Sequence, residues 1–67
     1  MSTQSEILRA ASLLVEAYGD MAVAGAFIRA DHLKARGDVQ GRQRWIRVAR
    51  AAEDLLSEQR PSNSIVH

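Results

Sequence analysis

The fold of this chain is decided by the stretch Gly37-Asp38-Val39-Gln40-Gly41-Arg42-Gln43-Arg44-Trp45, where one helix is expected to end and another to begin. Glycine after a helical run accepts the left-handed conformation that closes many helices. Asp38 then suits the N-cap, where a carboxylate accepts a hydrogen bond from a free backbone N–H. Gly41 lies inside the next helix at a cost of about 1 kcal/mol relative to alanine, so we expect it to allow close approach to the preceding helix. The stretch predicts a tight turn between two helices.

The same dipeptide occurs earlier, at Gly19-Asp20, and predicts a second turn of the same kind. The chain is rich in alanine and holds a single proline, Pro61, which favours helix throughout. We expect helices over roughly residues 4–18, 21–36 and 39–59. Short connections fold each helix back on the one before it. The sequence therefore predicts an all-α, compact three-helix bundle with short Gly-Asp turns: a single domain over residues 1–60, followed by a flexible C-terminal tail over residues 61–67.

Apolar residues recur at helical spacing on the first and third predicted helices. On the first they are Ile7, Leu8, Ala11, Leu14, Val15 and Tyr18; on the third they are Trp45, Val48, Ala49, Ala52, Leu55 and Leu56. Because Ala49, Ala52 and Leu56 are neighbours of Trp45 at helical spacing, a core position is favoured over stacking on a base or ligand.

The central predicted helix is apolar on two faces. One stripe consists of Val23, Ala26, Phe27, Ala30 and Leu33, and the other consists of Met21, Ala24, Ile28 and Ala35. A helix with two apolar faces generally packs between two neighbours. We expect the bundle itself to bury both stripes. The alternative is that the second stripe is exposed and binds an unknown protein partner or a second copy in a homodimer.

Positive charge concentrates around the third predicted helix, where Arg42, Arg44, Arg47 and Arg50 follow one another. A helix that carries arginines after a short turn is typical of DNA recognition helices. The other interpretation is a solvated face that Glu53, Asp54 and Glu58 partly neutralise. Nine Lys and Arg residues against eight Asp and Glu residues leave a net charge of only +1. This balance argues against nucleic acid as the partner, since phosphate contacts supply most nonspecific affinity.

Catalytic and cofactor chemistry find no support in the residues. The chain has no cysteine, and His32 has no further ligand at helical spacing, so we expect no metal. Paired carboxylates, a Ser–His–Asp set and a glycine-rich phosphate loop are all missing, so we expect no cofactor and no enzyme activity. No apolar run approaches the roughly 20 residues that span a bilayer, and the N-terminus lacks a basic leader region. We therefore expect a cytoplasmic location without membrane contact.

Gly37-Asp38, Gly41 and Trp45, with Val48, Ala52 and Leu55 after them, form a pattern found elsewhere. It resembles the Gly-Asp-x-x-Gly-x-x-x-Trp segment of a group of small bacterial all-helical proteins. The resemblance extends over about Glu6 to Leu56 and implies a helical fold, and this group has no established activity to transfer. The segment is also similar, more loosely, to the turn in tetratricopeptide-type hairpins, which are protein-binding scaffolds. The sequence thus predicts a small protein–protein interaction module, self-associating through its second helix, with nucleic-acid association through the four arginines as the alternative.

Overall fold

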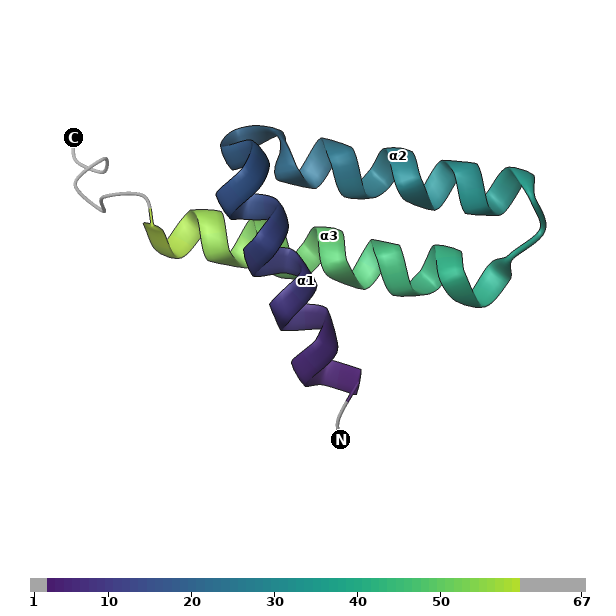
Figure 1. The fold of residues 1–67 in the computed structure, drawn as a ribbon, viewed down its shortest axis with the longest axis horizontal. Coiled ribbons are helices and arrows are strands. Elements are labelled where there is room, and N and C mark those ends of the chain that lie inside the picture. The colour runs from purple at the N-terminus through teal and green to yellow at the C-terminus, as the bar shows by residue number, and fades with distance from the viewer. Residues whose placement is uncertain (1–2, 60–67) are drawn as a thin grey trace.

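The structure, a computed structural model, describes residues 3–59, which are helical except for a turn at residues 36–38 (Figure 1). The elements are α1 (Thr3–Tyr18), a short 3₁₀ helix η1 (Gly19–Met21), α2 (Ala22–Ala35) and α3 (Val39–Gln59). The all-α prediction is confirmed, and the predicted helix boundaries lie close to the observed ones. The tail predicted over residues 61–67 lies outside the described residues.

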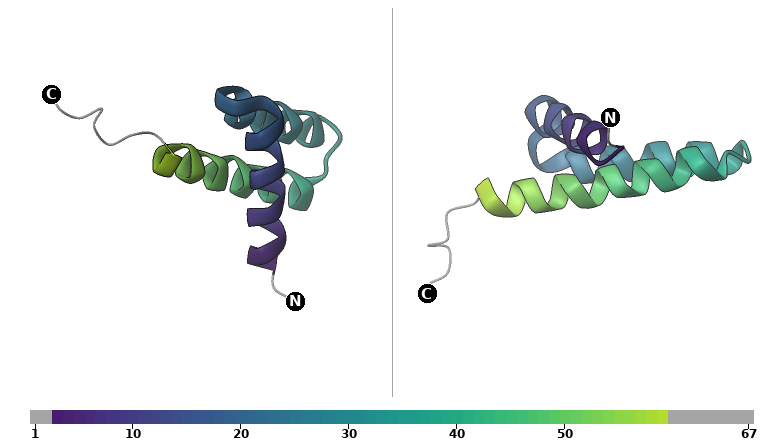
Figure 2. Two further views of the ribbon diagram at one scale, coloured as in Figure 1. Left: turned by 60° about the vertical axis from the view of Figure 1, so that its left-hand side comes forward. Right: turned by 90° about the horizontal axis from the view of Figure 1, so that it is seen from below.

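The helices form two layers. Figure 1 shows α2 and α3 as an antiparallel hairpin, and Figures 1 and 2 show α1 crossing one face of that hairpin. The contacts of α1 are chiefly with α3 and less with α2, whereas α2 packs along α3 for most of its length. One face of the hairpin is therefore covered by α1 and the other is not.

The turn at residues 36–38 follows the prediction closely. Gly37 has a φ of 81°, its N–H donates to the Lys34 carbonyl at 3.0 Å, and the Asp38 N–H donates to the Leu33 carbonyl at 2.9 Å. These two bonds form a Schellman motif, which ends α2. The Gly41 N–H then donates to Asp38 Oδ1 at 2.9 Å, so Asp38 is the N-cap that starts α3.

The expected role of Gly41 is wrong. A Cβ atom placed on Gly41 would lie 2.6 Å from Oδ2 and 2.9 Å from Cγ of Asp38, and none of its three nearest atoms belongs to α2. Glycine at this position leaves room for the capping carboxylate. It does not mediate the approach of α3 to α2.

The turn predicted at Gly19-Asp20 also differs from the expectation. Gly19 has the positive φ of 57° that the sequence suggested. However, Asp20 lies inside η1, the Ala22 N–H donates to the Gly19 carbonyl, and the N-cap of α2 is Met21, which makes no side-chain capping bond. Helical hydrogen bonding thus continues from α1 into α2, and the chain bends here without folding back. The predicted three-helix bundle with two equivalent turns is replaced by one long bent helical stretch that packs on α3.

The core lies where the three helices meet. Its buried members are Ile7, Ala11 and Val15 of α1, Ala22, Ala26 and Ala30 of α2, and Val48, Ala49 and Ala52 of α3. Six of these nine side chains are alanine, so the helices approach one another closely. The core faces predicted for α1 and α3 are confirmed, except that Leu8 and Tyr18 at the edge of the α1 face are exposed.

Candidate interaction surface

The orientation of α2 is fixed by its alanines. Ala22, Ala26 and Ala30 are buried, and α2 packs mainly on α3. Ile28 lies two residues from Ala26 and two from Ala30, so it is turned by about 200° from each of them. Ile28 therefore points away from α3, at the centre of the outer face of the helix.

All four residues of the second apolar stripe lie on this outer face, and all four are exposed: Met21, Ala24, Ile28 and Ala35. Met21 is 64% exposed and Ile28 is 56% exposed. The preferred expectation, that the bundle buries both faces of this helix, is wrong because α1 crosses the hairpin beside α2 instead of covering it. We call these four residues the outer stripe.

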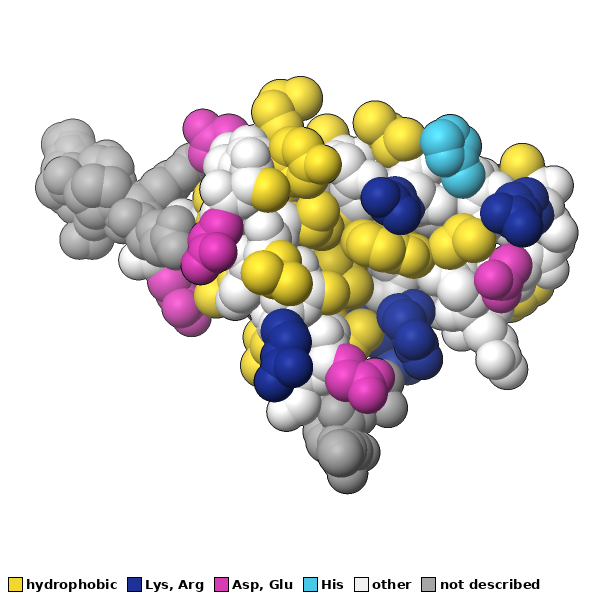
Figure 3. Space-filling model, in the orientation of Figure 1, with side chains coloured by type: hydrophobic (Ala, Val, Ile, Leu, Met, Phe, Trp, Pro, Cys, Tyr) yellow, Lys and Arg dark blue, Asp and Glu magenta, His cyan; other side chains and the backbone are white. Residues whose placement is uncertain are grey.

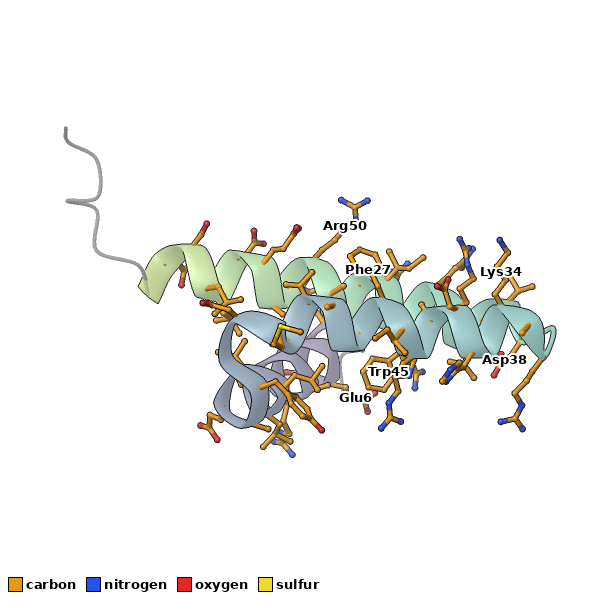
Figure 4. All side chains as sticks on the ribbon, turned by 90° about the horizontal axis from the view of Figure 1, so that it is seen from above. Glu6, Phe27, Lys34, Asp38, Trp45 and Arg50 are labelled. Carbon is orange, nitrogen blue, oxygen red and sulfur yellow. The ribbon has the colours of Figure 1, made fainter. Side chains whose placement is uncertain are left out.

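The first apolar stripe is buried only in part. Ala26 and Ala30 are buried and Val23 and Leu33 are half-buried, but Phe27 is 43% exposed. Figure 4 shows Phe27, Lys34 and Arg50 directed to one side of the hairpin and Trp45 directed to the opposite side, where Glu6 of α1 also lies. The sequence placed Phe27 in the core because it lies one turn from Val23 and Ala30, yet it stands at the edge of the buried face.

A groove of about 410 Å³ runs beside the outer stripe on the α1 side of the hairpin. Its lining residues are Gly25, Ile28, Arg29, His32 and Leu33 of α2, Arg36 of the turn and Trp45 of α3. The guanidinium carbon of Arg29 lies 5.2 Å from the centroid of the Trp45 ring, a cation–π contact. Trp45 is half-buried and packs against the core, so its expected anchoring role is confirmed, and it also contributes to this surface.

At the other end of α2 lies an acidic hollow of about 440 Å³, lined by Asp20, Val23, Glu53, Asp54, Leu56 and Ser57. The two hollows reflect a wider separation of charge. Residues 29–50 hold seven of the described Lys and Arg side chains and two acidic ones, whereas the remaining described residues hold six acidic side chains and only Arg9. In Figure 3 the Lys and Arg side chains of the visible face gather mostly toward the α2–α3 turn, and most of the Asp and Glu side chains lie toward the other end.

The four arginines of α3 do not share one environment. Arg44, Arg47 and Arg50 are exposed, and Arg42 is half-buried. Arg44 and Arg47 line a shallow hollow together with Gln40 and Gln43. Arg42 lies two residues before Arg44, which places it about 160° away around the helix. Arg44 and Arg47 therefore form the part of the proposed nucleic-acid contact that the structure brings together.

No residue between 4 and 58 that carries a polar or charged side chain is buried. Over the same described residues, no group of three or more His, Cys, Asp or Glu side chains is placed to hold a metal ion. His32 lies on the rim of the groove beside Arg29 and Arg36. These three residues recur at spacings of three and four, and this spacing in the sequence indicates that they share one side of α2 and its C-terminal end.

Residues Gln4–Ala35 form a helical stretch that is long and apolar enough, by length and composition alone, to cross a membrane. Charged residues such as Glu16 and Asp20 interrupt this stretch, so it is not an unbroken apolar run, and the expected absence of membrane contact stays a prediction. The same stretch bends at Gly19 and contributes Ile7, Ala11 and Val15 to the core, although only 22% of its most apolar window is buried.

Comparison with family models, with curated proteins and with solved structures gives no match. The resemblance to small bacterial helical proteins stays a prediction, and the function has to be argued from the surface itself.

Proposed function

We propose that this chain is a small, non-enzymatic protein–protein interaction module of the cytoplasm that self-associates through the outer stripe of α2. The observation that carries the proposal is the exposure of Met21 and Ile28 on a helix whose opposite side is buried. Single exposed apolar side chains are ordinary in folded proteins. Here Met21 at the end of η1 and Ala24 and Ile28 of α2 lie on successive turns of one face, and Ala35 lies on the same face beyond Asp31 and His32. An exposed apolar patch with polar residues around it is typical of an interaction site.

The neighbourhood of the outer stripe supports the proposal. Small side chains at Ala24, Gly25 and Ala35 let another helix come close, and the flexible thioether of Met21 adapts to a partner surface. The groove lined by Arg29, His32 and Arg36 gives the apolar stripe a polar rim. An apolar centre with a polar rim is the usual organisation of protein interfaces.

Sedimentation velocity at two protein concentrations tests the proposal. We expect the sedimentation coefficient of the natural chain to rise with concentration, and the Ile28→Glu variant to stay monomeric because a carboxylate would be buried without a partner. Leu13→Glu is the matched control, since Leu13 is 61% exposed and lies on α1, away from the outer stripe. A natural chain that is monomeric at both concentrations, or a Leu13 variant that dissociates like the Ile28 variant, would contradict the proposal.

A second candidate is nucleic-acid association, favoured by the exposure of Arg44 and Arg47 at the basic end of the hairpin. We rank it lower because the net charge of the chain is only +1. An electrophoretic mobility shift at low salt that disappears in an Arg44→Ala/Arg47→Ala variant would support it. If no shift occurs even at low salt, this second function is excluded.

A further inference from the structure

We infer that the two copies pair with their α2 helices antiparallel, related by a two-fold axis that passes beside Ile28. This inference rests on the proposed function and adds the orientation of the partner. Three properties lead to it: the spacing of the side chains on the outer face, their sizes, and the distribution of charge along the hairpin.

The spacing is symmetric about Ile28. Met21 lies seven residues before Ile28 and Ala35 lies seven residues after it, and seven residues are close to two helical turns. A two-fold rotation that reverses the helix direction therefore places Met21 of one copy over Ala35 of the other, with the two Ile28 side chains in contact at the centre. The same rotation places Ala24 near Asp31 and Gly25 near His32 of the other copy. An isologous interface needs this kind of self-complementary surface.

The sizes of the side chains favour the antiparallel arrangement. In it, a large residue faces a small one on either side of the central Ile28 pair: Met21 faces Ala35, Asp31 faces Ala24, and His32 faces Gly25. Alternating large and small side chains fill the space between two helices evenly. A parallel arrangement would stack Met21 on its own copy at one end and leave two small alanines, Ala35 and its copy, opposite each other at the other end.

The charges point the same way. The acidic hollow with Asp20, Glu53 and Asp54 lies at the N-terminal end of α2, and Lys34 and Arg36 lie at its C-terminal end. An antiparallel pair sets the acidic end of each copy near the basic end of the other. A parallel pair would set like charges together at both ends, which is unfavourable.

The pairing is expected to be weak. The 14 residues of α2 give a contact about 21 Å long. A single helix face of this length belongs at the small end of the range for specific interfaces. Association is therefore expected to depend strongly on protein concentration, and a covalent trap is the suitable probe.

Disulfide trapping tests the orientation directly, because the chain contains no cysteine and single substitutions introduce the only thiols. We expect Ile28→Cys to form a disulfide dimer with itself under mild oxidation, at least several-fold faster than Leu13→Cys, the exposed control on α1. Met21→Cys and Ala35→Cys should each dimerise at the control rate alone and several-fold faster when mixed, because the antiparallel pair brings these two positions together. Circular dichroism of each variant verifies that the helical fold is retained.

The outcomes distinguish a wrong orientation of the two helices from the absence of self-association. If Met21→Cys and Ala35→Cys each trap faster with themselves than with each other, the helices are parallel; the orientation is then wrong and self-association stands. If the mixture and the Ile28 variant stay at the rate of the Leu13 control while sedimentation shows a dimer, the interface lies elsewhere and the inference fails. If sedimentation shows no dimer either, the proposed function fails with it.

Discussion

The contact between Asp38 and Gly41 gives the sharpest test of how this fold is held. The carboxylate of Asp38 accepts the Gly41 N–H at 2.9 Å, and a Cβ on Gly41 would lie 2.6 Å from the other carboxylate oxygen. Alanine at position 41 and the cap at position 38 therefore compete for the same space. The two residues should be energetically coupled, although they are three positions apart on the surface of a helix.

The expected changes in stability follow from two contributions, the N-cap formed by Asp38 and the helix propensity of the residue at position 41. Asp38→Ala removes an N-cap and should lower the free energy of unfolding by about 1 kcal/mol. Gly41→Ala gains about 1 kcal/mol of helix propensity but forces the carboxylate away, which forfeits the cap, so the net change is near zero. In the Asp38→Ala background the cap is already lost, and Gly41→Ala should then stabilise by the full amount of about 1 kcal/mol. The double-mutant cycle is thus expected to give a coupling energy of about 1 kcal/mol.

Thermal and urea unfolding followed by circular dichroism measure these changes. For a domain of this size, 1 kcal/mol corresponds to about 4–8 °C in Tm. Gly25→Ala is the matched control, since Gly25 also lies in a helix but has nothing within 4 Å of a built Cβ. We expect it to stabilise by about 1 kcal/mol in both backgrounds. Asp38→Asn should stay close to the natural chain, because asparagine also caps well.

Competition between the Gly41 position and the Asp38 cap is ruled out if Gly41→Ala stabilises the natural chain as much as it stabilises the Asp38→Ala variant. That result would mean that the added methyl group and the capping carboxylate do not compete. A Gly25→Ala variant with the same background dependence as Gly41→Ala would also refute this competition, since the coupling would then not be local to the cap.

Three further changes test the packing of α2 on α3. Ala26→Leu should lower the free energy of unfolding by about 1–3 kcal/mol, because Ala26 is fully buried where helices meet and three added carbons overpack the contact. An unchanged Tm would contradict the close approach of α2 to α3. Trp45→Ala should cost about 2–4 kcal/mol in urea unfolding, toward the lower part of the range for buried tryptophan since Trp45 is half-buried; near-native stability would make it a surface residue. Arg29→Ala should cost about 0.5–1 kcal/mol in the natural chain and almost nothing in the Trp45→Ala background if the cation–π contact accounts for the loss.

Sequence reasoning succeeded where the determinants of structure are local. Gly37 and Asp38 end one helix and start the next through hydrogen bonds to residues only three to five positions away. The same pair of letters at Gly19-Asp20 misled, because the positive φ of Gly19 is compatible both with a helix end and with a bend into a 3₁₀ turn. The docking of α1 on α3, through residues far apart in the sequence, selects the bend over the helix end. That contact has no local sequence signal.

For the candidate surface, too, the sequence predicted the local features but not the contacts between separate helices. Helical periodicity correctly separated the outer stripe from the residues that include Ala26 and Ala30. It could not say which stripe another helix covers, because this depends on the direction in which α1 leaves the bend at Gly19. Arg29 and Trp45 could not be paired from the sequence either, since they belong to different helices and meet only through the register of the hairpin.

The composition of the core connects the fold to the proposed function. Six of the nine buried side chains are alanine, whereas Met21 and Ile28 keep more than half of their surface exposed. A large aliphatic side chain contributes about 1.5–3 kcal/mol when it is fully buried. Covering both residues on both copies would therefore contribute on the order of 3–6 kcal/mol before the cost of association. A chain of 67 residues has a typical net stability of about 3–10 kcal/mol. The contribution from covering these side chains is comparable to the net stability of the chain. Self-association should therefore raise the Tm of the natural chain with protein concentration, and the Tm of Ile28→Glu should stay constant. A concentration-independent Tm in the natural chain would mean that this alanine core sustains the fold alone, with the outer stripe exposed.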